Sequence, residues 1–438
     1  MSNKSKSIII YGGSRPISNE QSFREECNGY EYIPNILKPT SRTIAIGDIH
    51  GDLVVAIKML EIARCIEKVN IKKNDITTNL ASIISKNNNI EYYRWVGRDT
   101  IVVQVGDQVD RCRPIDGTCD MIGATPNDEA SDIKILKFYT DVNEIARKDN
   151  GRVISLLGNH ELMNVQGNLN YVSLFGILQY VPNVDLTDIQ FHGININELI
   201  KQGKQNRKLQ FSNQTKTDND NNGLPERANK YLACTRLSAV IVGDILFVHG
   251  GLIKKMAESY NIDDLNLIVR RWLLGKLSNE LESKSLLYTI GERDKLNDND
   301  NLSISFNLKD RLSLLLTSKH SIFWNRVLGQ IPADISINSS DNGETKTKVA
   351  IKCDEYLKPV FKLYNINGII VGHTPQISDK YGINSACDGH VWRVDIGASS
   401  AFEAFKDNKH IKSRLEILEI TYLNSKPQFK ILDNTKTT

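Results

Sequence analysis

The sequence predicts an α/β protein in which a mixed β-sheet carries a cluster of metal-binding side chains. Short apolar runs recur along the chain, polar turns follow five of them, and segments with helical spacing lie between them. This alternation is typical of βαβ units with parallel strands. The 438 residues carry 55 basic and 52 acidic side chains, so neither a nucleic-acid nor a membrane partner is expected on electrostatic grounds.

Five apolar runs are predicted to be buried strands because each is short and ends at a turn that contains glycine. Open α/β sheets bind ligands at the carboxyl ends of their strands, and all five turns lie at such ends. Glycine allows the chain to turn sharply there, so side chains from separate strands can converge. The runs are 43–46, 101–105, 153–157, 246–248 and 369–371, and the turns are 47–52, 106–111, 158–161, 249–251 and 372–374.

The segments between the strands are expected to complete a mixed sheet. Residues 52–69 and 132–146 place apolar side chains mostly at helical intervals, which predicts two helices. The apolar runs 238–242 and 245–248 flank a Gly-Asp pair, a strong indicator of a two-residue hairpin. The second half of the sheet is therefore expected to include antiparallel strands.

The chain is predicted to form one catalytic domain with insertions. Late apolar alternation predicts two closing strands, at 414–422 and 428–432, and helical patterns at 265–281 and 308–316 predict a cap over the turns. The expected division is an N-terminal extension at 1–39, a catalytic domain at 40–433 with insertions near 184–225 and 254–365, and a tail at 434–438.

The cysteines and the N-terminal residues predict a cytoplasmic location. The seven cysteines are odd in number and include no CxxC pair, which is typical of reduced thiols inside a cell. The apolar stretch 8–11 is too short for a secretory signal, and no run approaches the length of a membrane span.

The polar turns offer carboxylate, amide and imidazole groups but no thiolate, a set that suits Mn, Fe or Zn. Six such ligands exceed the needs of one tetrahedral ion. Two divalent ions about 3.5–4 Å apart would use all of them and would hold both the attacking and the leaving oxygen of a phosphate ester. The predicted ligands are Asp48, His50, Asp107, Asn159, His249 and His373, with Asp107 as the bridge.

Two further side chains in these turns are predicted to act as the general acid. His160 follows a ligand and Asp110 lies three residues beyond Asp107, so the two can pair as an oriented imidazolium that protonates the leaving alkoxide. A guanidinium matches phosphate geometry, although Arg326 is equally compatible with a structural salt bridge. The predicted phosphate-binding residues are Arg111, Arg326 and Asn159.

The motifs GDIHGD, GDQVDR, GNHE, HGG and GHT resemble those of the calcineurin-like metallophosphoesterases, in the phosphoprotein phosphatase branch. The resemblance covers residues 42–401. It implies a four-layer α/β/β/α sandwich of two mixed sheets with loop and helical insertions, and direct hydrolysis of phosphomonoesters on protein side chains. It also implies Asp48 and His50 on the first metal, Asp107 as the bridge, Asn159, His249 and His373 on the second metal, and His160 with Asp110 as the acid.

Three positions depart from the eukaryotic members of that branch. Asp52 stands where they have Gln, Leu157 where they have Arg, and Cys112 where Gly follows the Asp-Arg pair. The first two, with segments 371–376 and 392–397, are similar to the bacterial-type, Shewanella-like protein phosphatases. Cys112 leaves the geometry and the redox sensitivity of its turn open.

The predicted function is a metal-dependent phosphoprotein phosphatase, acting on phosphoserine and phosphothreonine with phosphotyrosine as a further substrate to be tested. A metal-bridging hydroxide would be the nucleophile. One alternative is a small-molecule phosphoesterase, such as a dinucleoside polyphosphate hydrolase or a nucleotidase. A second alternative is a non-catalytic interaction module on the same fold. A phosphoprotein is the expected partner, and the sequence leaves the presence of regulatory subunits open.

Overall fold

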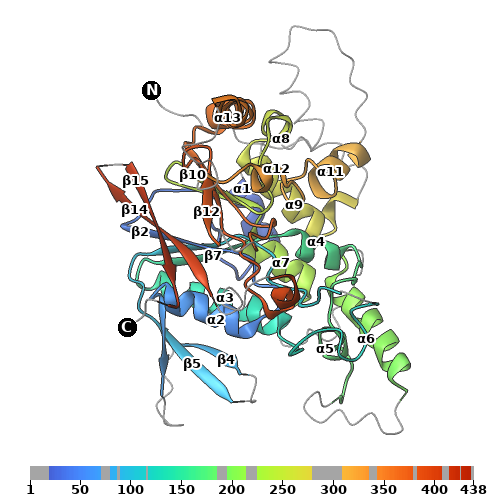
Figure 1. The fold of residues 1–438 in the computed structure, drawn as a ribbon. Coiled ribbons are helices and arrows are strands. Elements are labelled where there is room, and N and C mark those ends of the chain that lie inside the picture. Colours follow the sequence, from blue (N-terminus) through green and yellow to red (C-terminus); the bar gives the residue numbers. More distant parts are fainter. Residues whose placement is uncertain are drawn as a thin grey trace.

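Two six-stranded mixed sheets lie at the centre of the protein, and helices flank them (Figure 1). The computed structural model describes residues 19–70, 79–85, 89–114, 117–184, 195–213, 224–278, 308–334, 343–377, 382–406, 414–424 and 426–435. The strand order is β15-β14-β2-β6-β7-β8 in the first sheet and β1-β9-β10-β11-β13-β12 in the second. The mixed α/β class predicted from the sequence is confirmed.

The first sheet contains three of the five predicted strands. They are β2 (Arg42–Ile46), β6 (Ile101–Gln104) and β7 (Arg152–Leu156), which pair in parallel. The closing strands are found as the antiparallel hairpin β14 (Glu416–Leu423) and β15 (Lys426–Asp433), and β8 (Arg236–Leu237) completes the other edge.

The second sheet contains the other two predicted strands, β10 (Ile245–Val248) and β11 (Gly368–Val371), again as parallel neighbours. Side chains alternate along β10: Ile245 and Phe247 face the core shared with the first sheet, whereas Leu246 and Val248 face the helices. Both faces are thus buried, which explains the continuous apolar run. The predicted hairpin is confirmed by β9, and the remaining strands are β1 (Ile36–Leu37), β9 (Ala239–Val242), β12 (Asn384–Ala386) and β13 (Val391–Arg393).

The helix predicted at 52–69 is partly wrong. The helix α2 (Leu53–Ile62) stops before Arg64, whose left-handed φ of 52° turns the chain out of the helix. Residues beyond it form β3, part of a small antiparallel sheet that the sequence analysis did not predict. The apolar residues near the helix end fit both the helical period of 3.6 residues and the strand period of two, so spacing alone does not separate helix from strand there. This third sheet has the order β3-β5-β4, with β3 (Ile66–Val69), β4 (Ala81–Ile84) and β5 (Ile90–Trp95).

The other helices include two that were predicted from helical spacing. The helix predicted at 132–146 is α3 (Asp132–Arg147) and the helix predicted at 308–316 is α11 (Leu308–Leu316). The pattern at 265–281 overlaps α9, and its last residues, 279–281, lie outside the described residues. The remaining helices are α1 (Asn19–Glu26), α4 (Asn159–Val165), α5 (Leu174–Leu178), α6 (Ile196–Phe211), α7 (Ala228–Thr235), α8 (Lys254–Ser259), α9 (Ile262–Leu273), α12 (Val327–Gln330) and α13 (Gly343–Tyr364).

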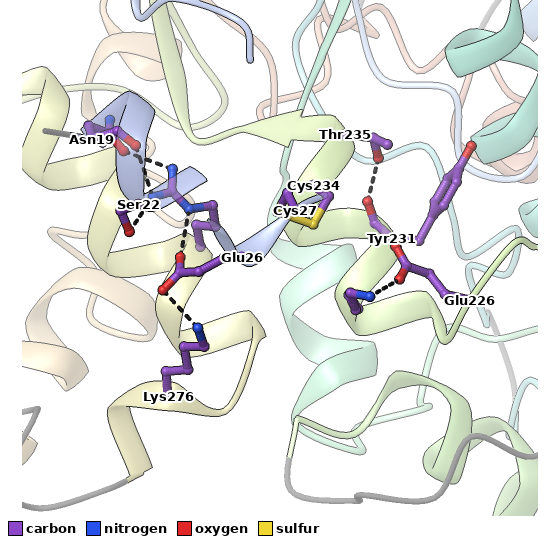
Figure 2. Close-up of a disulfide and its surroundings, with 11 residues drawn as sticks. Asn19, Ser22, Glu26, Cys27, Glu226, Tyr231, Cys234, Thr235 and Lys276 are labelled. Atoms are coloured by element: carbon purple, nitrogen blue, oxygen red, sulfur yellow. Dashed lines mark hydrogen bonds and ion pairs between the residues drawn. A yellow bond between two sulfur atoms is a disulfide. The ribbon is translucent and has the colours of Figure 1, made fainter. Parts of the chain in front are cut away.

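The prediction of reduced cysteines is wrong, because three disulfides join cysteines that the sequence separates by up to 207 residues. Spacing along the chain did not show that these thiols meet in space. Figure 2 shows one disulfide, which ties the chain just after α1 to α7 beside the ion pair of Glu26 with Lys276. The pairs are Cys27–Cys234, Cys112–Cys119 and Cys353–Cys387, and Cys65 is a buried free thiol.

The disulfides remove the support that the cysteines gave to a cytoplasmic location, because such bonds persist mainly in oxidising compartments. Among the described helices, none combines the length and the apolar character that crossing a bilayer requires.

Candidate metal centre

The turns after β2, β6, β7, β10 and β11 meet at one place and bring buried donor atoms together. One group of donors comes from His50, Asp107 and His160, and a second comes from Asp107, His249 and His373. Within each group the donor atoms lie within 4.8 Å of one another. Asp107 belongs to both groups, which is the position required of a bridging carboxylate.

The distances around Asp107 describe a compact cluster. Its Oδ2 atom lies 3.3 Å from Nε2 of His249 and 3.7 Å from Nε2 of His50. The remaining predicted ligands are adjacent: Asp48 Oδ2 lies 3.8 Å from His50 Nε2, and Asn159 Oδ1 lies 3.0 Å from His249 Nε2. The structure thus places the predicted metal ligands in one cluster, with His373 in the second donor group.

The backbone around Asp107 is held in an uncommon conformation. Asp107 has a φ of 54°, in the left-handed region, where a residue other than glycine costs about 1–3 kcal/mol. Glu161 stabilises this turn, because its carboxylate accepts hydrogen bonds from the backbone N–H of Asp107 at 3.1 Å and of Gln108 at 2.7 Å. A Cβ at Gly158 would lie 2.1 Å from Asp107 Oδ1, so glycine is needed there for close approach. The role of Glu161 was not predicted from the sequence.

The charges of the cluster suit a cation. Burial, together with the neighbouring Asp395 and Asp107, raises the pKa of Asp48 well above its usual value. Burial would also raise the pKa of Asp107, but His249 and His160 outweigh it, so that the pKa lies well below its usual value. Crowded carboxylates of this kind need positive charge nearby to remain ionised together.

Several buried atoms that could bind a metal ion have no hydrogen-bond partner among the described residues. They are Asp48 Oδ1, His373 Nε2 and Asp395 Oδ2. Burying such atoms without a partner is costly, and metal coordination removes the cost. His249 points its Nε2 into the cluster because its Nδ1–H donates to the carbonyl of Val105 at 2.9 Å. The donor set therefore fits divalent ions. Asp395, whose charge raises the pKa of Asp48, was given no role from the sequence.

His160 and Asp110 have the geometry expected of a general acid and the carboxylate that orients it. His160 Nδ1 is 2.8 Å from Asp110 Oδ2, while its Nε2 faces the cluster, 3.9 Å from Asp107 Oδ2. The second oxygen of Asp110 accepts a hydrogen bond from Asn164 at 2.8 Å and lies 3.4 Å from Nη2 of Arg207. This arrangement fixes the direction of the imidazole.

Arg207 was not predicted from the sequence. It lies on α6, inside the predicted insertion 184–225, and its fully buried guanidinium also bonds Asp132 at 2.7 Å. Nothing local distinguishes Arg207 from the other basic residues of the helix, so only the tertiary structure shows that the insertion supports the acid pair.

The two arginines predicted to bind phosphate lie differently from each other. Arg111 is buried and pairs with Glu129 at 2.9 Å and with Asp52 at 3.2 Å. Arg326 is exposed, and its Nη1 donates to the carbonyl of His373 at 2.6 Å, at the edge of the cluster. The phosphate-binding roles of Arg111 and Arg326 stay predictions.

The model of the family described as calcineurin-like phosphoesterase matches residues 41–376. The chain belongs to the calcineurin-like phosphoesterase family. This phosphoesterase is 31% identical over 316 residues to uncharacterized protein R398 of Acanthamoeba polyphaga mimivirus, which covers 68% of this chain and 99% of the relative. The predicted resemblance to the Shewanella-like protein phosphatases is confirmed by relatives of that name.

Shewanella-like protein phosphatase 2 of Arabidopsis thaliana is 26% identical to this phosphoesterase, over 56% of this chain and 55% of the relative. The chain thus spans about half the length of that relative. Shewanella-like protein phosphatase 1 of Plasmodium berghei is 24% identical, over 83% of this chain and 68% of the relative. Among solved structures, a cold-active protein tyrosine phosphatase of a psychrophilic Shewanella species aligns with a TM-score of 0.48 and 17% identity, over 92% of this chain and 83% of the other.

Proposed function

We propose that this phosphoesterase is a phosphoprotein phosphatase that hydrolyses phosphomonoesters of serine and threonine at a dinuclear centre of Mn, Fe or Zn. The observation that carries the proposal is the position of Asp107, which belongs to both groups of donor atoms. The names of the Arabidopsis and Plasmodium relatives support a protein substrate.

One ion would be held by Asp48 and His50, and the other by Asn159, His249 and His373. Asp107 would bind both ions. When bound, two such ions supply a hydroxide nucleophile at neutral pH and stabilise charge on the phosphate. His160 faces the same space with Nε2 and would donate its proton to the alkoxide oxygen that leaves. Asp110 holds the Nδ1–H of that imidazole, so the proton to be transferred is the one on Nε2.

The substrate class can be tested with purified, metal-loaded protein. We expect about two metal ions per chain by elemental analysis, and turnover of phosphoserine and phosphothreonine peptides. The panel should include phosphotyrosine peptides, nucleotides and dinucleoside polyphosphates. Hydrolysis of nucleotides alone would support the small-molecule alternative, and a protein without metal or turnover would support the interaction module.

Asp107→Asn tests the bridge, because an amide cannot hold two cations as a carboxylate does. We expect loss of bound metal and of turnover. Asp99→Asn is a matched control, since Asp99 is bonded to Ser41. An Asp107→Asn protein with wild-type metal content would contradict the assignment.

His160→Asn tests the acid separately from the metals. We expect turnover to fall by about 10²–10⁴-fold with metal content retained, the usual range for a general acid. His390→Asn is a matched control, because His390 is exposed and bonds the carbonyl of Asn367. Loss of metal from His160→Asn would instead identify it as a ligand.

The three disulfides support a further part of the proposal, that the protein works in a compartment where disulfides persist, in place of the predicted cytoplasm.

A further inference from the structure

A groove of about 540 Å³ opens beside the metal centre, and its lining residues belong mostly to two loops and to α6. One loop, 167–170, follows α4, and the residue after it, Tyr171, places its ring centroid 5.0 Å from that of His160. The other loop, 117–120, is joined by a disulfide to Cys112, directly after a ligand turn. The groove therefore begins next to the predicted general acid.

Helix α6 is fixed relative to that acid by a buried side chain. Arg207 Nη2 lies 3.4 Å from Asp110 Oδ1, and the other oxygen of Asp110 lies 2.8 Å from His160 Nδ1. Arg207 is fully buried, so the helix cannot shift along the groove without breaking this contact. Lys208 is the next residue on the helix, and it is exposed and lines the groove. Its place relative to the general acid is therefore set by its neighbour.

The side chain of Lys208 lies over the first of the two loops. Gly167 has a left-handed φ of 76°, and a Cβ at that position would lie 3.7 Å from Cδ and from Cε of Lys208. The aliphatic part of the lysine thus passes close to the loop, while its ammonium group stays in water. A lysine that is already held in this way loses less conformational entropy when it binds an anion.

The groove carries one unpaired positive charge among its described residues. Lys204 lines the groove too, but its Nζ lies 2.5 Å from Asp120 Oδ2, so these two charges cancel. The other oxygen of Asp120 accepts a hydrogen bond from Thr118. Lys208 has no carboxylate within ion-pair distance in the part of the chain that the structure describes. An anionic group that enters the groove therefore meets a cation that no described carboxylate neutralises.

We propose that this groove binds the polypeptide that flanks the phosphorylated residue of the substrate, and that Lys208 selects substrates with an acidic side chain in that flank. The inference rests on the proposed phosphatase function and names a substrate class for it. A substrate carboxylate beside Lys208 would leave the phosphorylated side chain free to reach the metal centre, because the groove begins beside His160. Lys208 does not touch the reacting atoms, so it acts on substrate affinity, read as KM, more than on kcat.

The test compares two phosphothreonine peptides that differ only in the charge of their flanks. One carries glutamate and the other lysine at residues within about four positions on each side, a reach of about 13 Å in an extended chain. We expect the metal-loaded wild type to have a KM about three- to tenfold lower for the glutamate peptide, at similar kcat. Raising the salt concentration should reduce this preference, because ions screen exposed charges.

Reversing the charge of Lys208 gives the decisive comparison. Lys208→Glu should shift the ratio of the two KM values by about tenfold in favour of the lysine peptide. Lys208→Met keeps most of the aliphatic part without the charge, and its ratio should fall between those of Lys208→Glu and the wild type. Lys362→Glu is the matched control, because Lys362 is also exposed on a helix but lies on α13, far from α6 in Figure 1. Turnover of 4-nitrophenyl phosphate, which has no flank, reports on the metal centre of each variant.

The inference is overturned if the wild type does not distinguish the two peptides, or if the KM ratio of Lys208→Glu stays within about twofold of the wild-type ratio. It is also overturned if Lys208→Glu lowers turnover of 4-nitrophenyl phosphate as much as turnover of the peptides, since the side chain would then act on the metal centre. Failure of the proposed function gives a different result, because the wild type would then hydrolyse neither phosphopeptide.

Discussion

Replacing Arg207 by methionine should strongly destabilise the protein, because this cation neutralises two buried carboxylates. Arg207 Nη2 lies 2.7 Å from Asp132 Oδ2 and 3.4 Å from Asp110 Oδ1, and none of the three side chains is more than 5% exposed. Burial raises the pKa of Asp132, and the charge of Arg207 opposes that rise. Methionine keeps much of the volume between Tyr180 and Phe211 but leaves Asp132 without its cation and Asp110 with His160 alone.

The expected loss follows from the cost of an unpaired buried charge. Removing one partner of a buried ion pair costs about 3–5 kcal/mol, a large part of the roughly 5–15 kcal/mol that stabilises a typical folded domain. The substitution also removes the hydrogen bonds from Nε to Asn164 at 2.8 Å and from Nη1 to the carbonyl of Gly176 at 2.9 Å. The neighbourhood of the acid pair should loosen, so turnover should fall as well.

Urea unfolding followed by tryptophan fluorescence measures this loss. Lys208→Met is the matched control, because Lys208 is the next residue on α6 and is exposed, and it should change stability by less than about 0.5 kcal/mol. Arg207→Lys keeps a charge and should fall between the two. A loss below about 1 kcal/mol in Arg207→Met, at the same m-value, would show that the two carboxylates do not depend on Arg207.

Three other results are expected. In denaturant without reductant, a thiol reagent should react with one free thiol per chain, and more than one reactive thiol would contradict the three disulfides. In the folded state the reagent should react with none, because burial raises the pKa of Cys65 to about 12 and suppresses its thiolate. Cys234→Ser should lower the free energy of unfolding by about 2–4 kcal/mol, measured in guanidinium, because it opens a covalent loop that spans 207 residues. Burial raises the pKa of Glu416, so the folded state keeps its proton longer than the unfolded chain; the stability this contributes is present at low pH and is lost as pH rises through the raised pKa. Glu416→Gln should therefore gain stability relative to the wild type as the pH rises above about 4.3, the ordinary pKa of glutamate, in urea unfolding measured at several pH values. A stability difference between the two proteins that does not change with pH would contradict this.

The five strands that precede the ligand turns could be predicted because a buried strand appears in the sequence as a continuous apolar run. In a strand whose two faces are both buried, successive residues must be apolar, as Ile245 and Leu246 of β10 are. The glycines that end such runs can also be read from the sequence. The ligand positions followed, since the carboxyl ends of these strands meet at one place.

What could not be predicted depends on contacts between distant residues. Arg207 meets Asp110 across 97 residues of sequence, and Cys27 meets Cys234 across 207. The helix boundary at Arg64 is set by a backbone angle that the apolar spacing does not report.

The bond between Cys27 and Cys234 has a practical consequence for handling this protein. The first three ligand turns, with Asp48, Asp107 and Asn159, lie in the chain between these two cysteines. A protease that cuts the backbone once in this interval would give two fragments that still migrate as one species on a denaturing gel, until a reducing agent separates them. Purity judged only from unreduced samples would therefore miss nicked molecules.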